Sequence, residues 1–352
     1  MGHPPTKCNP IILLLALLLC LWARAGFAQS VESFYKGRTI TLLVSTAPGG
    51  RYDLNGRLIA RHLGTFLPGH PNIVVENLPG GGGLALGNRL FNSSPRDGSV
   101  IAVMEPGTAQ VAVEGDPNAR FEPLKMTWIG SLSSFADDAD LMLVNASHPA
   151  KNIADLKRPG ISAKLGAVSP GSTDLTFAIL ARDLFGLNVE PVRGYPGATP
   201  IFLAMQSGEV DGQIINLSSV RTSQLALWNA GKMRPLMQFG RLTRLADVAD
   251  VPTARELVSD PKALALLDFA EQPFFMALPV AAPPEVPADR VAALRKAFME
   301  MTRDPAFLEE VRVGHFDLSP IDGEAVSKLI AGLAATPPDV VARFAKMVAA
   351  AP

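Results

Sequence analysis

Cysteine is scarce in this 352-residue chain: the two present, Cys8 and Cys20, both lie within the first 28 residues. Without those residues the chain has no thiol, which excludes disulfides, thiolate catalysis and cysteine-type zinc sites together. Aromatic residues make up only 7% of the chain, and 32 basic residues stand against 33 acidic ones with no long run of either sign. A nucleic-acid partner is therefore not expected.

Long hydrophobic runs are absent beyond the N-terminus. The apolar run 11–21 has eleven residues, too few for a helix that crosses a bilayer, which needs about 20. Small residues follow at Ala23, Ala25 and Ala28, as a signal peptidase requires. We expect residues 1–28 to be a cleaved signal peptide and the mature protein to be periplasmic. Leu19 argues against a lipid anchor at Cys20.

Apolar segments of strand length alternate with amphipathic segments of helix length, and 48% of the residues are hydrophobic. This order is typical of βαβ units, so we expect the α/β class with mainly parallel sheets. The expected strands are 40–45, 72–77, 99–104, 164–168, 188–194, 211–216, 234–239 and 274–280. The expected helices are 54–67, 85–93, 174–185, 198–208, 288–301, 304–311 and 339–348.

The first expected strand leads into the turn TAPGGRYD, residues 46–53. Gly49 and Gly50 can adopt positive φ, and N–H groups at the start of the following helix can bind an anion. The alternative is a plain strand-to-helix turn in which Asp53 is only a helix cap.

A second turn contains four consecutive glycines, residues 80–83, which offer main-chain donors but no side-chain chemistry. A phosphate-binding loop would need lysine where Asn88 stands, and the dinucleotide pattern fails at Ala85. Nucleotide binding is not predicted, and neither a cofactor nor a metal is expected.

A third turn, GAVSPGSTD at 166–174, carries Ser169, Ser172 and Thr173, which can bond a carboxylate or simply begin a helix. The nucleophile pattern G-x-S-x-G is not met, and the isolated histidines suggest no catalytic triad. Asp137, Asp138 and Asp140 lack calcium-loop spacing, and we expect them to face solvent.

Taken together, the motifs resemble the extracytoplasmic solute receptors of tripartite tricarboxylate transporters, the Bug family. The similar segments are FYKGRTITLLVSTAPGGRYD, VVENLPGGGGLALGNRLFNSSPRDGSVIAVM, VRGYPGATPIFLAMQSGEVDGQIIN, RPLMQFGRLTRLADVADVPTARE and FFMALPVAAPPEVPADRVAALRKAF. They extend over essentially the whole chain after the expected signal peptide.

The resemblance implies a fold like type II periplasmic-binding proteins, with two α/β domains and a ligand cleft between them. Domain 1 would comprise 29–140 and 272–352, domain 2 would comprise 141–271, and the hinge would lie near 141–145 and 274–280. The implied ligand-binding residues are Ala47, Gly49, Gly50, Asp53, Gly80, Gly81, Gly82, Gly83, Ser169, Ser172, Thr173, Tyr195, Gly197 and Asn216.

Arg51 and Tyr52 are bulky where the family has small residues, so Arg51 either contacts a ligand carboxylate or points to solvent. The serine- and threonine-rich third turn also departs from the family, which leaves the ligand's identity open. The resemblance implies a non-enzymatic, monomeric receptor that passes a small organic acid to membrane permease subunits. The alternatives are an exported hydrolase-like enzyme that uses the same cleft and a binding protein coupled to a sensor.

Overall fold

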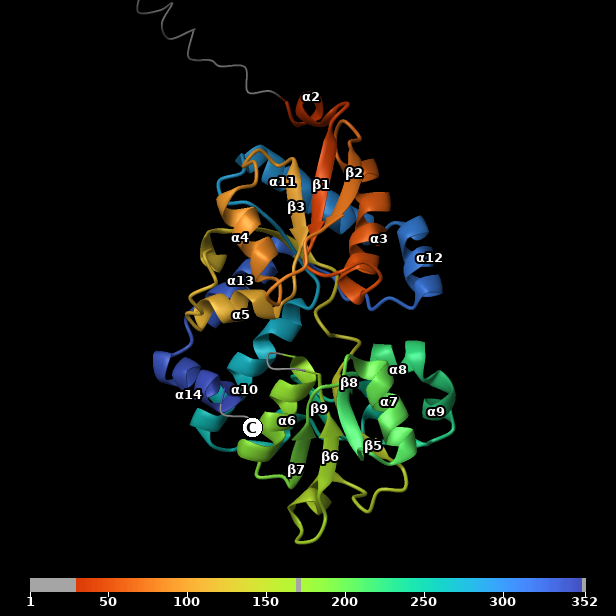
Figure 1. Ribbon diagram of the computed structural model, residues 1–352. Coiled ribbons are helices and arrows are strands. Elements are labelled where there is room, and N and C mark those ends of the chain that lie inside the picture. The colour runs from red at the N-terminus through yellow and green to blue at the C-terminus, as the bar shows by residue number, and fades with distance from the viewer. Residues whose placement is uncertain (1–29, 169–171, 350–352) are drawn as a thin grey trace, which may run out of the picture.

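The computed structural model describes residues 30–168 and 172–349, so the predicted signal peptide and Ser169 lie outside the described residues. Two separate sheets divide the molecule into two halves (Figure 1). The six-stranded sheet has the order β11-β4-β10-β3-β1-β2. Its strands are β1 (Thr39–Val44), β2 (Asn72–Asn77), β3 (Val100–Val103), β4 (Thr127–Ser131), β10 (Pro279–Ala282) and β11 (Ile321–Asp322).

The five-stranded sheet has the order β7-β6-β8-β5-β9 and occupies the other half (Figure 1). Its strands are β5 (Asp140–Asn145), β6 (Ala163–Gly166), β7 (Val189–Val192), β8 (Gly212–Asn216) and β9 (Met233–Phe239). The predicted α/β class with two sheets is confirmed, because helices pack against both of them.

The helices of the six-stranded half lie around its sheet in the upper part of Figure 1. They are α2 (Val31–Tyr35), α3 (Arg51–Phe66), α4 (Leu84–Asn92), α5 (Gly107–Val113), α11 (Ala288–Met301), α12 (Pro305–Gly314) and α13 (Gly323–Ala334). The apolar face of α3, with Leu58, Ile59 and Leu63, is fully buried. Gly56 lets this helix approach the sheet, because a Cβ there would lie 2.7 Å from Val44 Cγ2.

The other α-helices, together with the 3-10 helix η5, belong to the five-stranded half or connect it to the first. They are α6 (Thr173–Asp183), α7 (Ala198–Ser207), α8 (Leu217–Ser223), α9 (Leu225–Asn229), α10 (Pro261–Glu271), η5 (Gln272–Met276) and α14 (Pro338–Ala349). The C-terminal helix α14 packs against α10 and α6, as Figure 1 shows. In one contact of this packing, the Phe269 and Phe344 rings meet edge to face with centroids 5.2 Å apart.

The prediction of mainly parallel sheets is wrong. β1 is parallel to β2 and β3, and β6 is parallel to β7 and β8. However, β5 is antiparallel to both of its neighbours, β8 and β9, and β10 is antiparallel to β3 and β4. Each of these two strands follows a crossing from the other half of the molecule, so the local βαβ rule does not set its direction.

The expected strand 274–280 is also wrong in its first half, which forms the 3-10 helix η5, and β10 begins only at Pro279. The chain crosses between the sheets at 132–139, at 272–278 and again between α13 and α14. The predicted hinge segment 141–145 lies within β5, just after the first crossing. The predicted domain limits stay a prediction.

Candidate functional site

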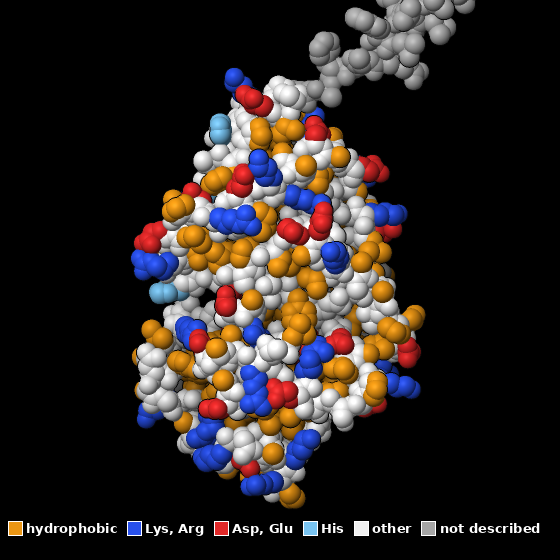
Figure 2. Space-filling model, turned by 180° about the vertical axis from the view of Figure 1, so that it is seen from behind, with side chains coloured by type: hydrophobic (Ala, Val, Ile, Leu, Met, Phe, Trp, Pro, Cys, Tyr) orange, Lys and Arg blue, Asp and Glu red, His pale blue; other side chains and the backbone are white. Residues whose placement is uncertain are grey.

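A cavity of about 750 Å³ is lined from both halves of the molecule. Figure 2 shows, from behind, the notch that separates the two halves, with both signs of charge interspersed over this face. One wall contains the start of α3, the four-glycine turn and the segment after β3; the other contains the starts of β5 and α6 and the end of β8. The polar and aromatic lining residues are Arg51, Tyr52, Glu105, Thr108, Gln110, Glu114, Asp116, Phe135, Asp140, Ser172, Thr173, Asp174, Thr176, Phe177, Gln213, Asn216, Ser219, Phe274 and Phe344.

The structure brings together only part of the predicted ligand-binding set. The members that line the cavity are Arg51, Gly81, Gly82, Ser172, Thr173 and Asn216. The described members that do not line it are Ala47, Gly49, Gly50, Asp53, Gly80, Gly83, Tyr195 and Gly197. These eight are therefore outside the cavity wall in this conformation.

Asp53 holds the first turn together from within. Its carboxylate is 2% exposed and accepts hydrogen bonds from Gly49 N–H at 2.8 Å, Asn77 Nδ2 at 2.9 Å and Arg57 Nε at 3.0 Å. The bond from Arg57, supported by those from Gly49 and Asn77, lowers the pKa of Asp53 to about 2. The N–H of Gly49 is therefore used inside the turn, directly before α3 begins at Arg51.

Arg51 extends from this turn to the cavity. Its guanidinium lies 3.3 Å from Asp317 Oδ2 and 5.8 Å from the centroid of the Phe135 ring. The Arg51 side chain is 32% exposed, whereas Asp317 is 4% exposed, and burial raises the pKa of Asp317 to about 6. The positive charge of Arg51 is therefore shared between a buried acid of its own half and the cavity.

The four-glycine turn has positive φ at each position, including +58° at Gly81 and +61° at Gly82. A Cβ at Gly83 would lie only 2.4 Å from Thr108 Oγ1, and that hydroxyl donates to the carbonyl of Gly82 at 3.2 Å. Side chains rarely tolerate this backbone conformation, so glycine is required here for the turn to pass so close to Thr108. Main-chain atoms of Gly81 and Gly82 thereby reach the cavity wall.

The N-terminus of α6 forms part of the opposite wall. Ser172 is its N-cap residue, but its side chain makes no capping bond to the helix N–H groups. Instead its hydroxyl bonds the carboxylate of Asp174, which also accepts from Val168 N–H at 3.0 Å and Leu175 N–H at 2.8 Å. First-turn donors and the helix dipole favour a negative group at such a helix start.

Asn216 lies at the end of β8 and lines the cavity, but its side chain is committed to a neighbouring network. Its amide donates to Asp138 Oδ2 at 3.2 Å and to Ser218 Oγ at 3.0 Å. Tyr195 lies elsewhere, with its hydroxyl donating to Glu209 Oε1 at 2.6 Å. This bond raises the pKa of Tyr195 to about 12.

The cavity is also lined by carboxyl groups that the sequence analysis missed. The prediction that Asp138 and Asp140 face solvent is wrong, because they are 1% and 5% exposed, and only Asp137 of that group is exposed. Burial raises the pKa of Asp140 well above its usual range, and burial raises the pKa of Glu114 to about 7. Glu105 also lines the cavity, and burial raises its pKa too.

An aromatic wall completes the cavity. The Phe274 ring lies 5.6 Å from that of Phe135 and 5.1 Å from that of Phe177, centroid to centroid. Phe135 has a φ of +59°, which is uncommon for a non-glycine residue, and it is 2% exposed in the crossing segment between β4 and β5. The arrangement offers an apolar surface beside charged groups, as small-molecule sites generally do.

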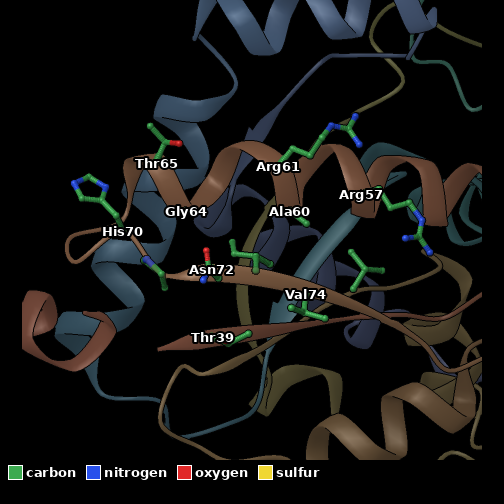
Figure 3. A pocket seen from close by; sticks show the side chains of 12 residues that line it. Thr39, Arg57, Ala60, Arg61, Gly64, Thr65, His70, Asn72 and Val74 are labelled. Carbon is green, nitrogen blue, oxygen red and sulfur yellow. The ribbon is translucent and has the colours of Figure 1, made fainter. Parts of the chain in front are cut away.

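A second hollow, an open groove of about 1000 Å³, lies on the outside of the six-stranded half between α3 and the edge strand β2 (Figure 3). Arg57 and His70 lie toward its two ends in this view. Arg57 is bonded to Asp53, and Arg61, on the same helix, is paired with Glu310 at 2.5 Å. None of the predicted ligand-binding residues lines the groove, so the cavity between the halves is the better candidate for a solute site.

Within residues 30–168 and 172–349, no cluster of three or more His, Cys, Asp or Glu side chains is arranged to hold a metal ion. No described helix has both the length and the apolar character to cross a membrane.

Comparison with known proteins identifies the relatives of this chain. A family model for the tripartite tricarboxylate transporter family receptor matches residues 58–343. Protein BugT of Bordetella pertussis is 28% identical over 256 residues, which cover 69% of this chain and 73% of BugT.

Two solved structures have a similar fold. A TctC solute binding protein from Polaromonas superposes with a TM-score of 0.66 at 20% identity, covering 88% of this chain and 99% of that one. MatC from Rhodopseudomonas palustris, solved with bound malate, superposes with a TM-score of 0.59 at 22% identity, covering 89% and 99%. The predicted periplasmic-binding fold with two α/β domains is confirmed.

Proposed function

Because the chain belongs to the family of tripartite tricarboxylate transporter receptors, we propose that it captures a small carboxylated solute in the cavity between its two halves. The solute is then delivered to the membrane subunits of a tripartite transporter. The observation that carries this proposal is the cavity itself, which is lined by helix starts and strand ends of both halves. Crevices of this type are where open α/β sheets bind ligands.

Three groups on the cavity wall favour the binding of a ligand carboxylate. Arg51 supplies a guanidinium, which makes charge-assisted hydrogen bonds to carboxylates. The start of α6, at Ser172 and Thr173, supplies main-chain donors and a favourable dipole. The exposed backbone of Gly81 and Gly82 faces the same space from the other half. MatC, a protein of the same fold, was solved with the dicarboxylate malate.

We assign the predicted site residues two different roles. Arg51, Gly81, Gly82, Ser172 and Thr173 would contact the solute. The other predicted residues of the first turn, together with Gly83, would set the position of those contacts, Asp53 through the hydrogen bond that it accepts from Gly49 N–H. Asn216 would act through its bonds to Asp138 and Ser218.

A binding role without covalent chemistry is favoured over the exported hydrolase. The hydroxyl of Ser172 is bonded to Asp174, which acts as a hydrogen-bond acceptor for the turn. Among the described residues that line the cavity there is no histidine to serve as a general base.

The protein would function in the periplasm as a monomer. Coupling to a sensor in place of a permease is distinguished by the genes beside its own.

The division into domains follows the sheets. We propose the limits 29–140 with 272–352 and 141–271, with one amendment: α14 lies in the first range but packs on α10 and α6. We therefore place α14 with the second domain. Ligand binding would close the two domains on the cavity.

A thermal-shift screen of the mature protein against mono-, di- and tricarboxylates and amino acids tests the function. Binding to the native state raises the melting temperature by mass action, so a true ligand should give a concentration-dependent rise. Calorimetry should then show one site per chain, and Arg51→Gln should weaken binding while Arg61→Gln, on the outer face of the same helix, does not. Equal affinity in both variants, or turnover of a bound ester, would overturn the proposal.

A further inference from the structure

We propose that the solute carries a cationic nitrogen in addition to its carboxylate, and that this nitrogen lies against Asp140. The inference rests on the proposed function, because it places a second group of the same ligand in the same cavity. The ligand class is then a zwitterion with N–H donors, such as an amino acid, in place of a simple dicarboxylate.

Asp140 is the residue that carries the inference. It begins β5, which lies between β8 and the edge strand β9 in the five-stranded sheet, and it lines the cavity while only 5% exposed. Its Oδ2 atom is buried and has no hydrogen-bond partner among the described residues. Buried carboxyl groups are rarely left without a partner, because desolvation without compensation is costly.

The neighbouring Asp138 shows what a satisfied carboxyl group looks like in the same segment. It accepts hydrogen bonds from Ala139 N–H at 2.9 Å, from Ser218 N–H at 3.0 Å and from Ser218 Oγ at 2.6 Å. Asp140, two residues later, has no equivalent set of donors. A donor that comes from the ligand would complete it.

The other carboxyl groups that line the cavity favour a cation near Asp140. Glu105, Glu114 and Asp174 line the same space, and the Arg51 guanidinium is the only cationic side chain among the described lining residues. That guanidinium is already 3.3 Å from Asp317. A dianionic solute would therefore place its second carboxylate beside further carboxyl groups, whereas an ammonium group can donate hydrogen bonds to their oxygens whether these groups are neutral or ionised.

The aromatic residues of the cavity wall are compatible with an ammonium group on the ligand. Phe135, Phe177 and Phe274 line the cavity, with centroid separations of 5.1 and 5.6 Å along the row. Aromatic rings attract cations through their quadrupole, and Arg51 already lies 5.8 Å from the Phe135 centroid. An ammonium group between Asp140 and this wall would have both a charge partner and an apolar surface.

A competing arrangement would keep Asp140 neutral, so that its proton is donated to a second ligand carboxylate. Burial raises the pKa of Asp140, the like charges of Asp138, Asp174 and Glu271 raise it further, and Arg51 opposes them. In the two arrangements the ligand affinity changes with pH in opposite directions. Affinity for an ammonium group should rise with pH as Asp140 ionises, whereas affinity for a dicarboxylate that needs the proton of Asp140 should fall.

Calorimetry on the mature full-length protein separates these cases with matched probes. The pairs are glutarate and glutamate, and succinate and β-alanine, with glycine betaine as a probe that cannot donate a hydrogen bond from nitrogen. We expect at least one zwitterion to bind 10-fold or more tightly than its paired dicarboxylate. Asp140→Asn should weaken that binding 10-fold or more and leave the dicarboxylate unchanged or improved.

Asp137→Asn is the matched control, because Asp137 is exposed on the same crossing segment and does not line the cavity. Glu114→Gln, at the cavity wall, provides a second variant if Asp140→Asn does not fold, and it should weaken the zwitterion in the same direction. If the dicarboxylates bind more tightly and Asp140→Asn shows no selective loss, the inference is wrong and the proposed function stands. If neither series binds, the proposed function itself is contradicted.

Discussion

The hydrogen bonds that Asp53 accepts within the first turn lead to a prediction about stability, and the structure allows us to estimate its magnitude. Asp53→Asn preserves the shape of the side chain but removes the charge that accepts hydrogen bonds from Gly49 N–H and Arg57. A fall in the pKa from 3.8 to about 2 corresponds to about 2.5 kcal/mol, at about 1.4 kcal/mol per pKa unit. Arg57 is 44% exposed and solvent screens part of this interaction, so we expect a loss of about 1–2 kcal/mol in the free energy of unfolding at pH 7.

The pH dependence gives this prediction a sign. The folded-state pKa of Asp53 lies below its unfolded value, so its contribution is present above about pH 4 and is lost as the pH falls toward 2. Urea unfolding curves of wild type and Asp53→Asn, recorded from pH 7 to pH 3, should therefore converge in acid. A variant as stable as wild type at pH 7, or a difference that does not shrink in acid, would refute the reasoning.

A matched control separates stability from positioning. Asp155 is 4% exposed and accepts from Lys151 N–H at 2.8 Å, but it lies in the five-stranded half away from the cavity lining. Asp155→Asn should also destabilise the protein, yet leave ligand affinity unchanged. Asp53→Asn should also weaken ligand affinity, because we expect the hydrogen bonds of Asp53 to fix the turn that precedes Arg51. Equal affinities in the two variants would show that the turn does not position the site.

Three further predictions concern separate parts of the fold. Arg51→Gln should weaken ligand binding about 10-fold or more, since charge-assisted hydrogen bonds contribute about 1.5–3 kcal/mol, and calorimetry should find Arg61→Gln unchanged. Burial raises the pKa of Glu271 to about 8, so the folded state retains a proton that the unfolded state releases above about pH 4.5, and stability falls as the pH rises toward 8. Glu271→Gln should flatten that decline in urea unfolding curves; an unaltered decline would show that this carboxyl group is not its source. Gly212→Ala should destabilise by more than about 3 kcal/mol, because a Cβ would lie 2.0 Å from the carbonyl oxygen of Leu143, and an unchanged unfolding midpoint would contradict this.

Local sequence patterns predicted the elements that depend on neighbours along the chain. The expected strand 72–77 and the expected helix 288–301 match β2 and α11 at both ends. The strand–turn–helix order around Gly49 and Gly50 also follows from local signals, since a run of buried residues, glycines and an acidic residue at a helix start are all local features.

The direction of β5 and the burial of Asp140 could not be predicted in this way. Asp140 pairs in register with Asn216 on β8 and with Phe239 on β9, both more than seventy residues away in sequence. An acidic residue that directly precedes a run of apolar letters was the one available signal, and it is equally typical of a strand that begins at the surface. Which carboxyl groups line the cavity thus depends on long-range packing.

The packing of α14 has a mechanical consequence. Two domains that are joined by two neighbouring segments can both bend and twist about those segments. Here the chain returns a third time, and Phe344 is seated against Phe269 on the far side of the last crossing. This third connection opposes twisting of one half against the other, so we expect motion between the halves to be an opening and closing about a single axis. Removal of 338–349 would release this restraint and would leave Arg51 and the four-glycine turn in place, but it would also remove Phe344 from the cavity wall.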